Sequence, residues 1–274
     1  MLTGGFATAV VGVAGGGIAV ARNPHGTRRA LHSLGVLDGP DRAAPVVDAL
    51  VEYGTLPSPF GPVNYGLYLP AGDMAAVLYC LHGRGGNRRD PFDGLGVHRF
   101  VAERRLPWAV ASLDGGETFW HNRRDGSNSQ RDLVDGLMPF VASKAPSASS
   151  AVIGWSMGGY GALLVGQQHP DAFAAVVASG PSLWSTFSSA TSGAFDDVGD
   201  FDANDVLGRA PQLAGEPVRI DCGEDDPFAD SVRELVRRAP TITGGVRRGF
   251  HEDASWRSYL PDQLDFLERT LEHR

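Results

Sequence analysis

The pentapeptide Gly154-Trp155-Ser156-Met157-Gly158 holds a serine in a setting that suits nucleophilic chemistry. It fits the pattern G-x-S-x-G, follows a short apolar run and precedes a helical pattern that stops before Pro170. A tight turn between a strand and a helix strains such a serine and projects its hydroxyl from the carboxyl edge of a sheet. The pattern predicts Ser156 as a nucleophile, and the alternative is an idle serine at a glycine-rich junction.

A serine hydroxyl attacks an ester only when a base accepts its proton and a third group orients that base. His251 stands between a short predicted strand and the last predicted helix, where a histidine of a catalytic loop is expected. His169 instead closes the helix after the serine, and His273 is the penultimate residue. The sequence therefore predicts His251 as the base, and the alternative is a surface-loop histidine.

The acid that orients the base is expected after the predicted strand 218–222, because the chain order in α/β-hydrolases is serine, acid, histidine. The loop that follows this strand offers Glu224, Asp225 and Asp226. Spacing alone does not separate the two aspartates, and Glu224 is expected to be solvated.

An acyl transfer also needs donors for the oxyanion. The backbone N–H of Met157, directly after the serine, is one candidate, and the N–H of Arg84 is the other. Arg84 lies in the glycine-rich segment 82–86, at the end of the strongest apolar run. His82 in the same segment is predicted to fix the loop by hydrogen bonding.

Three tryptophans are candidates for lining a substrate cleft: Trp120, Trp155 and Trp184. The aromatic residues of the loop 114–121, which includes Trp120, could line the cleft or cap the core. Five aspartates between residues 196 and 205 do not fit an EF-hand loop and are predicted to be solvated. No metal site and no cofactor are expected.

Strands and helices alternate after residue 62, which predicts a mainly parallel central sheet with helices on both faces. The predicted strands are 63–69, 75–81, 108–113, 151–155, 173–179, 218–222 and 245–249. The predicted helices are 92–105, 133–144, 157–169, 229–238 and 254–271. The irregular stretch 181–214 is interpreted as a lid-like insertion.

The segments LHGRGG, GWSMGGYGALL, CGEDDPF and GFHEDASWRSYLPDQLDFL together resemble the putative-esterase family of α/β-hydrolases. That family includes S-formylglutathione hydrolases, feruloyl esterases, enterochelin esterases and the mycolyltransferases of actinobacteria. The resemblance covers roughly residues 60–272 and implies an α/β-hydrolase fold. Its G-x-x-D pattern matches Gly223 and Asp226, which favours Asp226 as the acid, and Trp256 matches a tryptophan that follows the histidine. The chain looks most like exported actinobacterial esterases of unassigned substrate.

The net charge and the first residues of the chain indicate which partners and which location to expect. The net charge of −8 argues against a nucleic-acid partner. Residues 1–21 carry no charged side chain and are interpreted as a signal-like segment or membrane anchor, which favours export over a cytoplasmic location. Residues 22–62 are predicted to be a linker or N-terminal arm, and residues 63–274 the catalytic domain. Cys80 and Cys222 are predicted to be free thiols in the core.

These features predict a serine carboxylic-ester hydrolase that acts through an acyl-enzyme on a small-molecule or lipid ester. An acyltransferase that passes the acyl group to a sugar or lipid alcohol is the first alternative. A non-catalytic envelope protein of the same fold is the second alternative. The sequence makes no prediction of an oligomeric state.

Overall fold

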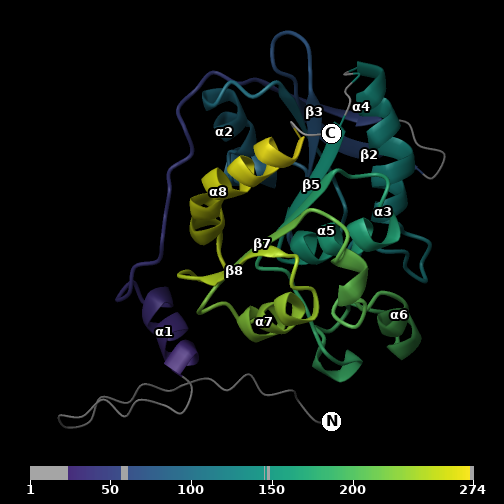
Figure 1. Cartoon of the computed structure of the whole chain (residues 1–274). Coiled ribbons are helices and arrows are strands. Elements are labelled where there is room, and N and C mark those ends of the chain that lie inside the picture. Colours follow the sequence, from purple (N-terminus) through teal and green to yellow (C-terminus); the bar gives the residue numbers. More distant parts are fainter. Residues whose placement is uncertain (1–23, 57–60, 145, 147–148, 272–274) are drawn as a thin grey trace.

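An eight-stranded sheet in the order β1-β2-β4-β3-β5-β6-β7-β8 forms the centre of the molecule (Figure 1). The computed structural model describes residues 24–56, 61–144, 146 and 149–271. The strands are β1 (Val51–Leu56), β2 (Val63–Tyr68), β3 (Ala76–Leu81), β4 (Trp108–Leu113), β5 (Ser149–Trp155), β6 (Ala175–Ser179), β7 (Val218–Gly223) and β8 (Thr243–Arg247).

Strands β4, β3, β5, β6, β7 and β8 are parallel to one another, and β2 runs antiparallel to both of its neighbours, β4 and β1. Every residue of β3, β4 and β6 is buried, as expected for continuous apolar strands covered on both faces. Because parallel strands end at the same edge of a sheet, the loops after β3, β5, β7 and β8 lie together there.

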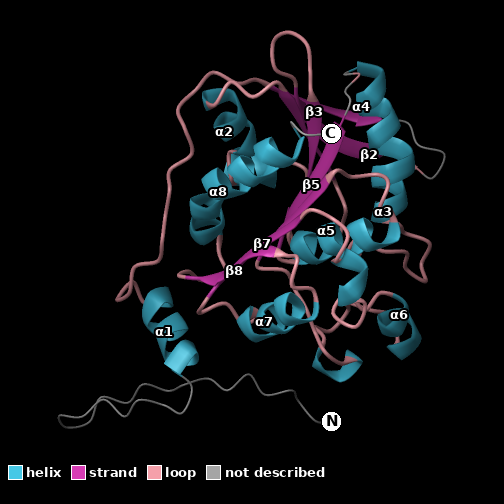
Figure 2. Ribbon diagram, viewed as in Figure 1, coloured by secondary structure: helices cyan, strands magenta, loops and turns pink. Residues whose placement is uncertain are grey.

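Helices cover both faces of the sheet (Figure 2). On one face α2 and α8 pack into one apolar cluster, and on the other face α4, α5 and α7 pack into a second. The α-helices are α1 (Pro24–Ser33), α2 (Val97–Glu103), α3 (Ser129–Arg131), α4 (Met138–Lys144), α5 (Met157–Gln168), α6 (Val198–Ala203), α7 (Ala229–Arg238) and α8 (Asp253–Leu271). Short helical turns are η1 (Asp90–Gly94), η2 (Asp132–Leu137), η3 (Phe187–Ser189) and η4 (Ala210–Leu213). The predicted α/β-hydrolase architecture is confirmed.

Several sequence-based boundaries differ from the structure. The predicted helix 92–105 is split into η1 and α2, because Gly96 adopts a left-handed φ of 68° between them. The predicted arm 22–62 contains β1, which pairs with β2, so the sheet begins before residue 63. The signal-like segment 1–21 lies outside the described residues. Within the described part of the chain, no helix is long and apolar enough to cross a membrane.

The segment 181–214 is more ordered than the predicted lid of solvated aspartates. The Asp196 carboxylate pairs with Arg123 at 2.9 Å, and Asp197 caps α6 by accepting a hydrogen bond from the backbone N–H of Asp200. The Asp200 carboxylate in turn accepts from the N–H of Asp196 at 2.8 Å. Asp196 and Asp200 are partly buried and help to fix the fold of the segment, whereas Asp197 and Asp202 are exposed, as the sequence predicts.

Both cysteines are free and buried, as predicted. Cys80 lies in β3 and Cys222 in β7. Burial raises the pKa of both thiols, so both remain protonated and unreactive. The cysteines act as small apolar side chains of the core.

Helix α1 docks on the edge of the domain through His32, whose ring nitrogens both face oxygen acceptors. Nδ1 lies 2.6 Å from the carbonyl oxygen of Leu37, and Nε2 lies 2.8 Å from the carboxylate of Glu252. Only the doubly protonated imidazolium donates both hydrogen bonds. The hydrogen bond to Glu252 is the main cause that raises the pKa of His32 above its ordinary 6.5.

This geometry predicts that the docking of α1 weakens as the pH rises. The pKa of His32 is higher in the folded than in the unfolded chain. The contribution of His32 to the free energy of unfolding is therefore fully present below about pH 6.5 and is lost as the pH rises past the raised pKa. We expect His32→Asn to lower the free energy of unfolding by about 1 kcal/mol at low pH and by less at high pH. Thermal unfolding of both proteins from about pH 5 to about pH 9 measures this. A difference that stays constant with pH would contradict the protonated state of His32.

Candidate active site

Ser156 occupies the sharp turn between β5 and α5. Its backbone has φ 54° and ψ −116°, a strained conformation for a residue with a side chain. Its N–H donates to the carbonyl of Ser179 at the end of β6, at 3.0 Å, which secures the turn against the neighbouring strand. The strand–turn–helix geometry that the G-x-S-x-G pattern predicts is therefore present.

The turn closes so tightly that Gly158 has no room for a side chain. A Cβ there would stand 1.9 Å from the carbonyl oxygen of Leu81 and 2.6 Å from that of His82, both backbone atoms. We expect Gly158→Ala to lower the free energy of unfolding by about 3 kcal/mol, because β3 and α5 must separate. Denaturant unfolding measures this, with Gly215→Ala as the control, since a Cβ at Gly215 meets nothing within 4 Å. Equal midpoints for the two variants would refute the close packing.

His251 bridges Ser156 and Asp226. Its Nε2 lies 2.8 Å from Ser156 Oγ, and its Nδ1 lies 2.7 Å from Asp226 Oδ2. The second carboxylate oxygen of Asp226 accepts from the N–H of Phe228 at 2.8 Å, so this carboxylate is held on both sides. The rings of Phe228 and Trp256 flank the imidazole, with centroids 5.5 and 5.1 Å away.

The other two carboxylates of the loop after β7 point away from His251. Asp225 is 1% exposed and accepts from Arg28 Nε at 2.7 Å, and its other oxygen lies 2.9 Å from His25 Nδ1. Glu224 is partly exposed and has Arg28 3.6 Å away. The structure thus brings Asp226 to the histidine and leaves Asp225 to helix α1.

The two predicted oxyanion donors lie on either side of Ser156, and of the two only Arg84 lines the cavity. Met157 is the first residue of α5, and the segment with Arg84 runs past the serine, since a Cβ on Gly83 would lie 3.5 Å from Ser156 Cβ. Among the described residues, neither the Met157 nor the Arg84 amide has a hydrogen-bond acceptor.

His82 fixes the loop after β3, as the sequence predicts. Its ring is buried, and its Nε2 accepts from the N–H of Gly115 at 2.8 Å. Nδ1 therefore carries the proton and donates to the carbonyl of Gly83 at 2.8 Å. Burial lowers the pKa of His82, which keeps the ring neutral. This histidine ties the loops after β3 and β4 together.

A cavity of about 470 Å³ opens beside Ser156 and His251. It is lined by His82, Gly83, Arg84, Asp90, Leu95, Trp155, Ser156, His251, Glu252, Asp253 and Trp256. Of the three tryptophans predicted for the cleft, only Trp155 lines it.

Of the two interpretations left open for Trp120, the structure supports the cap on the core and not the cleft wall. Trp120 is 1% exposed, donates from Nε1 to the carbonyl of His82 at 3.3 Å, and packs against Gly161 in the core. Trp184 does not line the cavity either. It contacts Phe228 edge-on at 5.6 Å, one ring away from the histidine. Trp120 therefore supports the site from the core, and the partly exposed Trp184 contacts it through Phe228.

Sequence reasoning missed a group of side chains around the cavity. Asp90, Glu252 and Asp253 place three carboxyl groups on its wall. Burial raises the pKa of Asp253. Ser182 Oγ lies 3.3 Å from Ser156 Oγ. Of these four residues, the sequence could have indicated Glu252 and Asp253, because they directly follow His251. Asp90 and Ser182 follow other strands and carry no such signal. Within the described residues, no group of three or more His, Cys, Asp or Glu side chains could hold a metal ion.

Comparison with known proteins agrees with this geometry. The family model described as "Putative esterase" matches residues 61–267, a segment that contains Ser156, Asp226 and His251. The chain belongs to this family. The match begins after α1, so that helix lies outside it.

The proteins that this chain resembles include several esterases. The iron(III) salmochelin esterase of Escherichia coli O6:H1 is 26% identical over 198 residues, which is 65% of this chain and 48% of that protein. The chain therefore spans about half the length of this curated relative. Among solved structures, a ferulic acid esterase matches with a TM-score of 0.68 at 23% identity, covering 81% of this chain and 98% of that one. An S-formylglutathione hydrolase from Agrobacterium tumefaciens matches with a TM-score of 0.68 at 16% identity, covering 81% and 96%.

Proposed function

We propose that the protein is a serine carboxylic-ester hydrolase that works through an acyl-enzyme on Ser156. The observation that carries the proposal is the continuous hydrogen-bonded chain from Ser156 through His251 to Asp226, with distances of 2.8 and 2.7 Å. Membership of the esterase family supports the same chemistry. The names of the salmochelin and ferulic acid esterases support an ester substrate.

In the acylation step, Ser156 Oγ attacks the ester carbonyl while His251 Nε2 accepts the hydroxyl proton. Asp226 holds the other nitrogen of the ring and stabilises the imidazolium that forms. The carbonyl oxygen becomes an oxyanion, and the amides of Met157 and Arg84 donate to it. His251 then gives the proton to the leaving alkoxide, and the alcohol departs.

In the deacylation step, water replaces the alcohol and His251 accepts a proton from it. The resulting hydroxide attacks the acyl carbon, Ser156 leaves with the proton from His251, and a carboxylic acid is released. This cycle needs no cofactor. The cavity next to the serine has the size of a small ester.

The proposal is tested with a panel of p-nitrophenyl esters of graded acyl length, with and without a candidate sugar or lipid alcohol. We expect p-nitrophenolate and the free carboxylic acid as products under both conditions. Hydrolysis of no ester in the panel would contradict an esterase. An ester of the added alcohol as the main product would instead support the acyltransferase alternative. Failure of the protein to react with any fluorophosphonate would support the non-catalytic alternative.

A further inference from the structure

Helix α1 contacts both loops that carry the histidine and its acid. It comes from the N-terminal arm, outside the segment that the family model matches, and packs beside the end of β8 (Figure 1). One set of contacts reaches Asp225, directly before Asp226. The other set reaches Phe250 and Glu252, on either side of His251. A single helix thus joins the acid loop to the base loop.

At the acid loop, α1 supplies the charge partners of a buried carboxylate. The side chain of Asp225 is 1% exposed, and Arg28 donates to it at 2.7 Å while His25 lies 2.9 Å from its other oxygen. Arg29 donates to the backbone carbonyl of Asp225 at 3.2 Å. A buried carboxylate without a cation is costly, so loss of Arg28 would drive Asp225 toward solvent and would turn the adjoining Asp226 with it.

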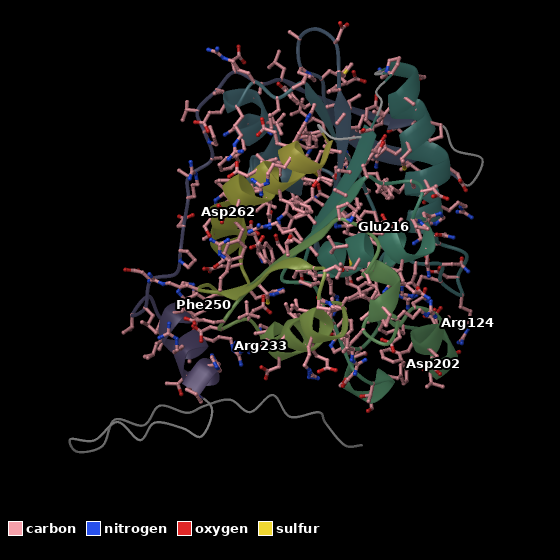
Figure 3. The ribbon with its side chains drawn as sticks, in the orientation of Figure 1. Arg124, Asp202, Glu216, Arg233, Phe250 and Asp262 are labelled. Carbon is pink, nitrogen blue, oxygen red and sulfur yellow. The ribbon has the colours of Figure 1, made fainter. Side chains whose placement is uncertain are left out.

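At the base loop, α1 holds the residues on both sides of the histidine. The ring of His32 stacks on Phe250, with centroids 3.8 Å apart and planes 6° from parallel. Its Nε2 lies 2.8 Å from the carboxylate of Glu252. Phe250 points toward α1 in Figure 3. The backbone of His251 is therefore held between two contacts with the same helix.

We propose that α1 is a positioning element of the active site, in which Arg28 and His32 set the Asp226–His251 geometry that activates Ser156. This inference rests on the proposed function, because it concerns the same triad. Productive sites hold their groups to within about 0.5 Å, and a loop displaced by about 1 Å can cost 100-fold in rate. Neither Arg28 nor His32 lines the cavity, and their side chains contact Asp225 and Glu252 and not the triad, so they act through the loops.

The test uses the full-length chain with Arg28→Met, Asp225→Asn and the double variant. The matched control is Arg233→Met, because Arg233 pairs with Asp230 at 2.6 Å on the exposed side of α7 (Figure 3) and does not line the cavity. The readouts are kcat and KM for a p-nitrophenyl ester, the rate constant of fluorophosphonate labelling, and Tm. All rates are measured well below the Tm of each variant, so that they report on folded protein.

We expect Arg28→Met to lower both kcat and the labelling rate between about 10-fold and 100-fold, with KM within about twofold of the wild type. The double variant should lose no more than the more affected single variant, because both changes remove one interaction. Arg28→Lys should recover part of the rate, and the Arg233→Met control should match the wild type. His32→Asn should lower the labelling rate independently, which keeps the test valid if Arg28→Met does not fold.

A purely structural role for α1 would lower Tm and leave kcat and the labelling rate unchanged, and this result would overturn the proposal. A wild type that hydrolyses no ester and takes up no fluorophosphonate would overturn the proposed function itself. A labelled, active wild type with equally active Arg28 and His32 variants would overturn only the role of α1.

Discussion

Replacing Ser156 by alanine is expected to lower kcat for a p-nitrophenyl ester by about 10⁴-fold or more. Without Oγ no acyl-enzyme forms, and only the oxyanion donors and the binding of the ester remain to accelerate attack by water. KM should change little, since the cavity keeps its other lining residues. Initial rates of p-nitrophenolate release by the purified variant measure this loss.

The control for this change is Ser143→Ala, because Ser143 is exposed on α4 and its hydroxyl donates only to the carbonyl of Phe140 among the described residues. It should match the wild type in kcat and Tm. A Ser156→Ala protein that is folded and retains more than about a tenth of the wild-type rate would exclude Ser156 as the nucleophile.

Asp226→Asn is expected to lower kcat by about 10³-fold to 10⁴-fold. The amide keeps the shape of the carboxylate but no longer stabilises a positive charge on His251, and it favours the wrong tautomer of the ring. The carboxylate already accepts from Phe228 N–H at 2.8 Å, so the amide group has one fixed oxygen and turns its NH₂ toward Nδ1. Steady-state kinetics of the two proteins at the same pH measure this loss.

Asp225→Asn is the matched comparison, because the two aspartates are neighbours and both are buried. It removes the partner of Arg28 and should lower kcat by between about 10-fold and 100-fold, which is less than the loss for Asp226→Asn. A larger loss for Asp225→Asn than for Asp226→Asn would mean that the acid is Asp225 and that the loop rearranges in solution.

The residues of the turn around Ser156 were predictable because their signal is local. A strand, a glycine-flanked serine and a helix follow one another within residues 149–168, and the structure has the same order. The parallel sheet was predictable for a similar reason, since buried strands such as β3 are continuous apolar runs. The position of His251 after the last strand followed from chain order alone.

Contacts between distant segments were not predictable. The sequence left open whether Trp120 lines the cleft or caps the core, and the structure shows that its ring fills the space that Gly161 leaves open on α5. The choice between Asp225 and Asp226 depends on Arg28, nearly 200 residues earlier in the chain. Only the spacing of His25, Arg28 and His32, which places them on one face of a helix, hinted at a common contact surface.

In the proposed reaction, Ser156 is the residue that carries the acyl group. The most direct test of this role is reaction of the wild-type protein with a fluorophosphonate, in which Oγ displaces fluoride, followed by peptide mass spectrometry. We expect one phosphonyl group per chain on the peptide with Ser156, and loss of ester hydrolysis in proportion to its formation. Full inactivation with the phosphonyl group on another residue, or full modification of Ser156 with hydrolysis unchanged, would contradict this role.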